Sequence, residues 1–249
     1  MASISRLPGK AKTLVSYLPS LILALVVVDV LLLAVNVIGA PSFLDLDQEK
    51  NFPTWYSSAK LLGAAMAALW CWRLEPAERR RGASGLFWPR AAVLLAVLSM
   101  DETATAHERL AALLMSGAAG MSLRTRLLGG DQLKDAFVWP VLFAPLALAI
   151  FGFLLYPLWE RMRDNRRSLI LGVLGCAAFV LAMILEGPAV YTSPPIAAWG
   201  AAEVARYRLF ILVEEGAELA GTTLMLAALL LHGAWLANVA WGEGDGTDS

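Results

Sequence analysis

The chain has 249 residues, of which 58% are hydrophobic and only 16% are charged, and its formal net charge is -1. Soluble domains carry about 25% charged residues, and a soluble protein this apolar would expose large apolar patches and aggregate. The composition therefore indicates an integral membrane protein, and the lack of excess positive charge argues against nucleic acid as a partner.

Six apolar stretches are each long enough to cross a bilayer, which takes about 20 helical residues. The first continues too far to be the apolar part of a cleavable signal peptide. A polar block interrupts the third, so this helix can be either continuous or broken. The predicted helices lie near Leu14–Val37, Trp55–Trp72, Ala91–Met115, Phe137–Trp159, Ser168–Leu185 and Tyr207–Leu236.

Basic residues are unevenly distributed over the connections between these helices. The N-terminal tail and the second and fourth connections are rich in them, whereas the first connection is acidic. Cytoplasmic connections carry the excess of Lys and Arg, so we expect both termini in the cytoplasm. The sequence predicts an all-α, polytopic six-helix bundle in the plasma membrane, of the kind found in a bacterial inner membrane. The basic residues are Arg6, Lys10, Lys12, Arg73, Arg79, Arg80, Arg81, Arg90, Arg161, Arg163, Arg166 and Arg167.

The connections are too short for a second domain. We expect a single transmembrane domain over residues 1–241 and a disordered acidic tail over residues 242–249. The expected partners are the lipid bilayer and either further copies of the chain or a larger membrane complex. The basic connections also suit anionic lipid headgroups, although the topology signal alone accounts for them.

Two polar blocks interrupt otherwise apolar helices, at residues 99–109 and 214–223. An ionised carboxylate in the middle of a bilayer costs several kcal/mol, and several together repel each other. They must be protonated, paired or bound to cations, and the basic residues nearby are too few to pair with all of them. The candidate metal ligands in the two blocks are Asp101, Glu102, His107, Glu108, Glu214, Glu215 and Glu218.

Helical spacing suggests how these residues cooperate. On a continuous third helix, Asp101, Thr105 and Glu108 share one face, and Glu214 and Glu218 are one turn apart on the sixth. We expect these two helices to be antiparallel neighbours in the core, with Asp101 near mid-bilayer. Three supporting residues lie at the same level on other helices: Asp29, Lys60 and Glu186. Of these, Asp29 is expected to pair with Lys60.

Three functions remain open. Carboxylates with one imidazole suit a Zn, Fe or Mn ion, with His107 and Glu108 as catalytic candidates for a hydrolase or an oxidase. The arrangement is analogous to four-helix di-iron proteins but lacks their Glu-x-x-His spacing. The same residues could instead form the path of a proton-coupled or cation transporter. The third possibility is a structural subunit of a membrane complex, whose protonated carboxylates bond across helices.

Overall fold

The computed structural model describes residues 9–48, 50–81, 84–106, 155–190 and 200–242, and isolated positions between 109 and 152. Helix is the only regular structure in this part of the chain, so the all-α class is confirmed there. The predicted stretches 14–37, 55–72, 168–185 and 207–236 lie within four of its helices, and most of the predicted fourth helix lies outside the described residues. The helices are α1 (Gly9–Ile38), α2 (Phe52–Leu74), α3 (Phe87–Ala104), α7 (Arg166–Val190) and α8 (Ala201–Gly242), with short 3₁₀ turns at Ser42–Leu44 and Ser84–Leu86.

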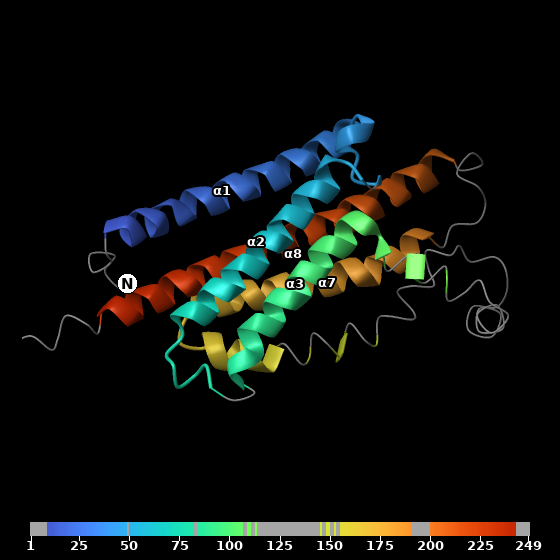
Figure 1. Ribbon diagram of the computed structural model, residues 1–249. Helices are drawn as coiled ribbons and strands as arrows, with labels where there is room; N and C mark the ends of the chain where they lie inside the picture. The colour runs from blue at the N-terminus through green and yellow to red at the C-terminus, as the bar shows by residue number, and fades with distance from the viewer. Residues whose placement is uncertain are drawn as a thin grey trace, which may run out of the picture.

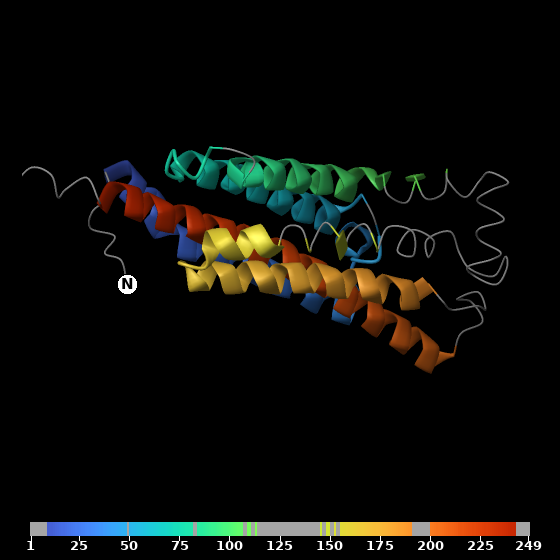
Figure 2. The ribbon, with the colours of Figure 1, turned by 90° about the horizontal axis from the view of Figure 1, so that it is seen from below.

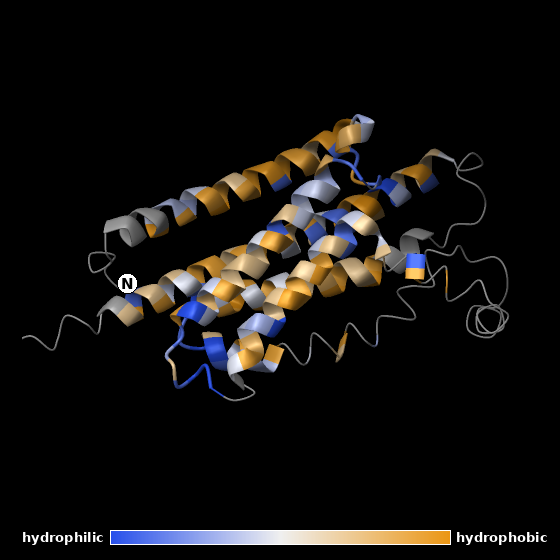
Figure 3. Ribbon diagram, in the orientation of Figure 1, coloured by the Kyte–Doolittle hydropathy of each residue, from blue (hydrophilic) through white to orange (hydrophobic). Residues whose placement is uncertain are grey.

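Three helices are long and apolar enough to cross a membrane: α1 over Val15–Ile38, α7 over Arg166–Leu185 and α8 over Ala201–Ala240. Apolar residues cover the helices, and hydrophilic segments gather at the two ends of the bundle (Figure 3). The protein is therefore a membrane protein. We call the end with residues 39–51 and the start of α8 the acidic end, and the end with residues 75–81 and 161–167 the basic end.

The long helix α8 is the centre of the described bundle (Figure 1). It packs against α7, α2 and α1, and α3 packs against α2. Seen from below, α2 and α3 lie on one side of α8 and α7 on the other (Figure 2). Our expectation that the third and sixth helices pack directly is wrong for the described residues, because α2 takes that place. One contact between α3 and α8 is that of Trp88 with His232, whose ring centroids are 5.5 Å apart.

The contact between α7 and α8 depends on two glycines. A Cβ atom added at Gly175 would lie 3.2 Å from both the carbonyl oxygen of Gly221 and the backbone nitrogen of Met225. A Cβ added at Gly221 would lie 3.3 Å from the carbonyl oxygen of Gly175. Small residues let helix backbones approach closely in membranes, where van der Waals packing replaces the hydrophobic effect between helices. The two glycines therefore set the distance between α7 and α8.

The third helix ends inside its polar block. Its last residue is Ala104, and Thr105 follows in the left-handed conformation, with φ 49° and its N–H donating to the Asp101 carbonyl at 2.7 Å. Of the two alternatives for the predicted stretch Ala91–Met115, the helix is therefore broken, at Thr105, and the face shared by Asp101, Thr105 and Glu108 on a continuous helix does not apply. Because α3 begins at Phe87 and ends at Ala104, Asp101 and Glu102 lie in its last turn, near the acidic end.

We predict that Gly175→Leu destabilises the protein by about 1–3 kcal/mol, because a side chain there forces α7 away from α8. Thermal unfolding in detergent measures this loss. The matched control is Val173→Leu, which places the same side chain at an exposed position of α7 and leaves the melting temperature unchanged. Equal melting temperatures for the two variants would contradict the close packing.

Candidate functional site

A buried ion pair joins three helices near the acidic end. The ammonium nitrogen of Lys60, on α2, lies 2.9 Å from Oδ1 of Asp29, on α1. It also donates to the Leu219 carbonyl at 2.9 Å and to Oγ1 of Thr223 at 3.1 Å, both on α8. Thr223 donates in turn to Oδ2 of Asp29 at 2.6 Å. The pairing of Asp29 with Lys60 is as the sequence analysis expected.

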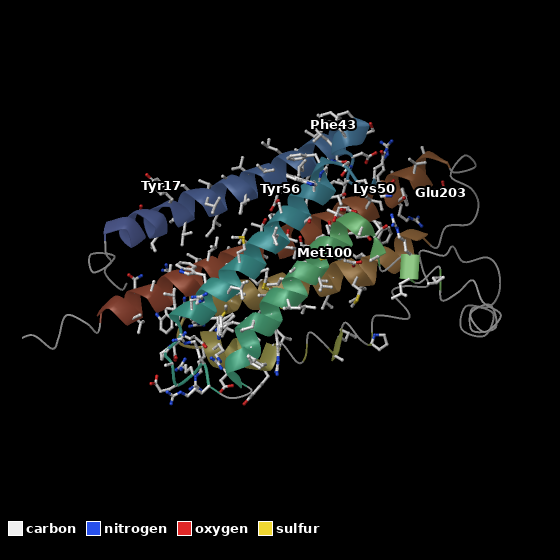
Figure 4. The ribbon with its side chains drawn as sticks, in the orientation of Figure 1. Tyr17, Phe43, Lys50, Tyr56, Met100 and Glu203 are labelled. Atoms are coloured by element: carbon white, nitrogen blue, oxygen red, sulfur yellow. The ribbon has the colours of Figure 1, made fainter. Side chains whose placement is uncertain are left out.

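The Lys60 side chain is 2% exposed, and all its hydrogen-bonding capacity is used. An ammonium group has three N–H donors. They meet Asp29, Leu219 and Thr223, and the ring of Tyr56 lies 4.3 Å from the nitrogen on a further side. Tyr56 is labelled on α2 in Figure 4, and its hydroxyl donates to the Leu25 carbonyl of α1. Lys60 is therefore committed to Asp29 and does not form a salt bridge with another carboxylate.

Carboxylates gather beside this ion pair, on the side of the acidic end. Glu214, Glu215 and Glu218 lie within two turns of α8, and the charges of Glu214 and Glu218 both act on Glu215. Glu102 of α3 is close enough to act electrostatically on Glu215 and on Lys60. We call these four residues the carboxylate group: Glu102, Glu214, Glu215 and Glu218.

Serine pairs place Glu102 in this group. The hydroxyl of Ser99 on α3 donates to the Ser58 carbonyl of α2 at 2.9 Å, and the hydroxyl of Ser58 donates to the Ser99 carbonyl at 2.8 Å. Glu102 follows Ser99 by three residues, so it lies on nearly the same face of α3, one turn nearer the acidic end. The reciprocal bonds therefore hold that turn of α3 against α2 and bring Glu102 toward α8.

Glu214 is the most enclosed member of the carboxylate group. Its residue is 7% exposed, and its Oε2 atom is buried and makes no hydrogen bond among the described residues. A buried ionised carboxylate oxygen without a partner costs much more than a neutral group, so the oxygen needs a proton or a cation. Oε2 of Glu214 is therefore the atom at which a proton or a cation is most needed.

Sequence reasoning missed one acidic residue of the site. Asp47 belongs to the 39–51 connection, and its charge acts on both Glu214 and Glu215. The hydroxyl of Tyr207, near the start of α8, donates to Oδ1 of Asp47 at 3.0 Å. The sequence analysis used this acidic connection only for topology. The signal was weak because a contact between positions 160 residues apart has no local pattern.

Two asparagines shape the connection that carries Asp47. The side-chain amide of Asn36 donates to the carbonyls of Leu32 and Leu44, and its oxygen accepts the N–H of Leu46. Asn51 caps α2 by accepting the N–H of Thr54 at 3.3 Å, and its amide also donates to the Asp45 carbonyl. These bonds fold the connection back on the helix ends and place the exposed Asp47 beside α8.

The structure places only some of the predicted site residues together. Asp101 lies in the last turn of α3 beside Glu102, and Glu186 lies in α7, with its side chain outside the described positions. His107 and Glu108 also lie outside the described residues. Within the described ranges, no group of three or more His, Cys, Asp and Glu side chains is arranged to hold a metal ion.

The basic end holds polar residues that sequence reasoning did not connect. Arg161 forms a buried ion pair with Glu75, which joins the chain after α2 to the helical segment before α7. His232 is fully buried between Trp88 and Trp235, and neither ring nitrogen has a partner in the described part. These ring contacts indicate that His232 packs between the two indole rings.

A family model matches residues 20–233, which include every helix of the described bundle at least in part, and its description is Domain of unknown function (DUF8692). The chain belongs to this DUF8692 family. None of the curated proteins and none of the solved structures matches the chain. Membership of DUF8692 therefore gives a family but no activity, and the function must be argued from the site.

We predict that Lys60→Met destabilises the protein by about 3–5 kcal/mol, because it leaves the Asp29 carboxylate buried and unpaired. The double variant Lys60→Met/Asp29→Asn recovers part of this loss, because it removes the unpaired charge. Denaturant titration of the purified protein in detergent measures both. Lys50→Met, which removes an exposed lysine from the connection, is the control and leaves stability unchanged. A double variant no more stable than Lys60→Met would contradict the ion pair.

Proposed function

We propose that this DUF8692 protein binds a cation at the carboxylate group, and that the cation is a divalent metal ion such as Zn, Fe or Mn. The observation that carries the proposal is the buried Oε2 atom of Glu214, which makes no hydrogen bond among the described residues. Lys60 lies nearby, but its three donors are all used by Asp29, Leu219 and Thr223. A bound cation supplies the missing partner of Glu214 Oε2.

The proposed topology has six membrane-spanning helices, with both termini in the cytoplasm of a bacterial cell. The arginines of the basic end then face the cytoplasm, in agreement with the positive-inside rule. The carboxylate group lies in the outer half of the bilayer. The helix α8, 42 residues long, extends about 63 Å and so reaches beyond the hydrocarbon core, which is about 30 Å thick.

The metal proposal assigns ligands from two helices and one neighbouring segment. Glu214 and Glu218 of α8 and Glu102 of α3 would supply hard oxygen donors, which Mn and Fe accept readily, and a bound ion would have to draw these three carboxylates closer together. His107 and Glu108 follow the left-handed Thr105 by two and three residues, and a nitrogen ligand from His107 would complete a site suited to Zn or Fe.

Proton uptake by the same carboxylates is the second candidate, as part of proton-coupled or cation transport. The specific observation in its favour is that the described carboxylates form no group arranged for a metal ion. A protonated Glu214 would carry no charge and would remove much of the cost of its burial. In a sealed-vesicle flux assay with a pH-sensitive dye, a transporter moves protons, whereas a static metal site does not.

Metal content tests the leading proposal. We predict that the detergent-purified protein contains stoichiometric Zn, Fe or Mn by elemental analysis, and that Glu214→Gln/Glu218→Gln contains at least about ten-fold less, because both substitutions replace charged oxygen ligands with neutral amides. The control is Glu203→Gln, since Glu203 lies in the first turn of α8, about three turns before Glu214 (Figure 4). A wild-type protein that contains no metal and binds none on dialysis would refute the metal site.

We also predict that Asp47→Asn slows cation binding by about two- to ten-fold at low salt, because an exposed carboxylate at the mouth of a site raises the local cation concentration. The difference fades as added salt screens the charge. Stopped-flow binding of Mn(II) or Zn(II) to chelator-stripped protein measures the rate. Tyr207→Phe, which removes the hydroxyl that holds Asp47, gives a smaller change in the same direction. Rates unchanged by Asp47→Asn at every salt concentration would exclude this role.

A further inference from the structure

The two connections at the basic end form one exposed arginine surface. Residues 76–81 make a compact turn, in which the N–H groups of Arg79 and Arg80 both donate to the Pro76 carbonyl. Residues 163–167 make the turn into α7. The arginine surface consists of Arg79, Arg80, Arg81, Arg163, Arg166 and Arg167, all exposed. The acidic residues of the same two turns are Glu78 and Asp164, so positive charge predominates.

A buried ion pair fixes the two turns to each other. Arg161 pairs with Glu75, and the side chains of both are almost fully buried. The same guanidinium donates to the Arg79 carbonyl at 3.3 Å, and Arg79 and Asp164 also lie 4.0 Å apart across the junction. Asn165 donates from its side chain to the Leu231 carbonyl of α8 at 3.4 Å. These bonds fix the backbone of the two turns that carry the arginines. A ligand that binds the arginine surface therefore does not have to order this backbone first.

The arginine surface lies directly beside apolar residues that face lipid. Ile170 and Leu174 of α7 are 46% and 50% exposed, and they follow Arg166 and Arg167 within two turns. On the adjoining helical segment, Trp159 is 58% exposed. Tryptophan of this kind is typical of the headgroup level of a bilayer. The guanidinium groups are thus at the depth where lipid phosphates lie.

The kind of basic residue is more specific than topology requires. The positive-inside rule is satisfied by lysine as well as by arginine, yet every basic residue in the two turns is arginine. The planar guanidinium fork donates two parallel hydrogen bonds to one phosphate, which an ammonium group does not. Several forks side by side on a fixed surface match phosphodiester headgroups.

We propose that the arginine surface is a binding site for anionic phospholipids of the adjoining leaflet, with the arginines holding the headgroup phosphates and Trp159 lying against the glycerol region. The site is separate from the carboxylate group, and it does not depend on a bound cation. It would tie the helix ends of α2 and α7 to the membrane surface through one or more tightly held lipids.

Lipid retention measured by native mass spectrometry tests this proposal. The full chain is released from nanodiscs that contain equal amounts of phosphatidylglycerol and phosphatidylcholine, and the lipid that remains bound is identified. We expect wild type to retain phosphatidylglycerol preferentially. Arg80→Gln/Arg81→Gln should lower this preference by about ten-fold, because each arginine near the surface contributes to anionic-lipid binding. The matched control, Arg206→Gln/Arg208→Gln, removes two exposed arginines from the acidic end and should keep the preference.

A conservative variant separates guanidinium recognition from charge alone. Arg80→Lys/Arg81→Lys keeps both charges and should still lose several-fold of the preference, because the bidentate bonds are lost. Size-exclusion chromatography and circular dichroism establish that each variant is folded. The proposal is overturned if wild type holds the two lipids equally, if the glutamine variant retains wild-type preference, or if an acidic protein segment competes fully with the lipid.

Discussion

The Lys60 ion pair is the interaction on which the arrangement of the bundle depends. Helices in a bilayer gain no hydrophobic energy from contact with each other, because lipid chains are as apolar as leucine. Most of α1 faces outward, and little of its span is buried against the other helices. A charged bond from Lys60 to Asp29, completed by Thr223 and the Leu219 carbonyl, supplies a specific link between α1, α2 and α8. Apolar contacts alone would not define the register of α1.

The same ion pair produces the chemistry of the acidic end. Lys60 is paired with Asp29, and the charges of Glu102, Glu214, Glu215 and Glu218 lie close beside this pair. The repulsion between these carboxylates raises the free energy of their ionised forms, and burial raises it further. A proton or a bound metal ion at the buried Oε2 atom of Glu214, as proposed above, would remove this cost. The ion pair of Lys60 with Asp29 thus bears both on the packing of the helices and on the proposed cation site.

Much of the fold could be predicted from the sequence because apolar length is a local property. Residues 168–185 and 207–236 needed no tertiary information to be recognised as helices. The pairing of Asp29 with Lys60 followed from matching depth on neighbouring spans. A break in the third helix was one of two alternatives, but its position could not be predicted, because Thr105 takes a left-handed conformation that a threonine rarely adopts. The packing of α2 on α8 was also missed, since the choice of neighbour depends on close contacts such as that of Gly63 with Leu226.

The part of α8 beyond Thr223 distinguishes the two proposed functions. Leu226, Ala227, Ala228 and Leu229 are all buried and form an apolar layer between the carboxylate group and His232. A hydrated path for ions needs polar groups at each step, and this layer supplies none from α8. Transport would require α8 to move relative to its neighbours, yet Gly175 and Gly221 hold it in close backbone contact with α7. A metal ion held at the acidic end needs no such movement, so the packing of α8 favours binding over conduction.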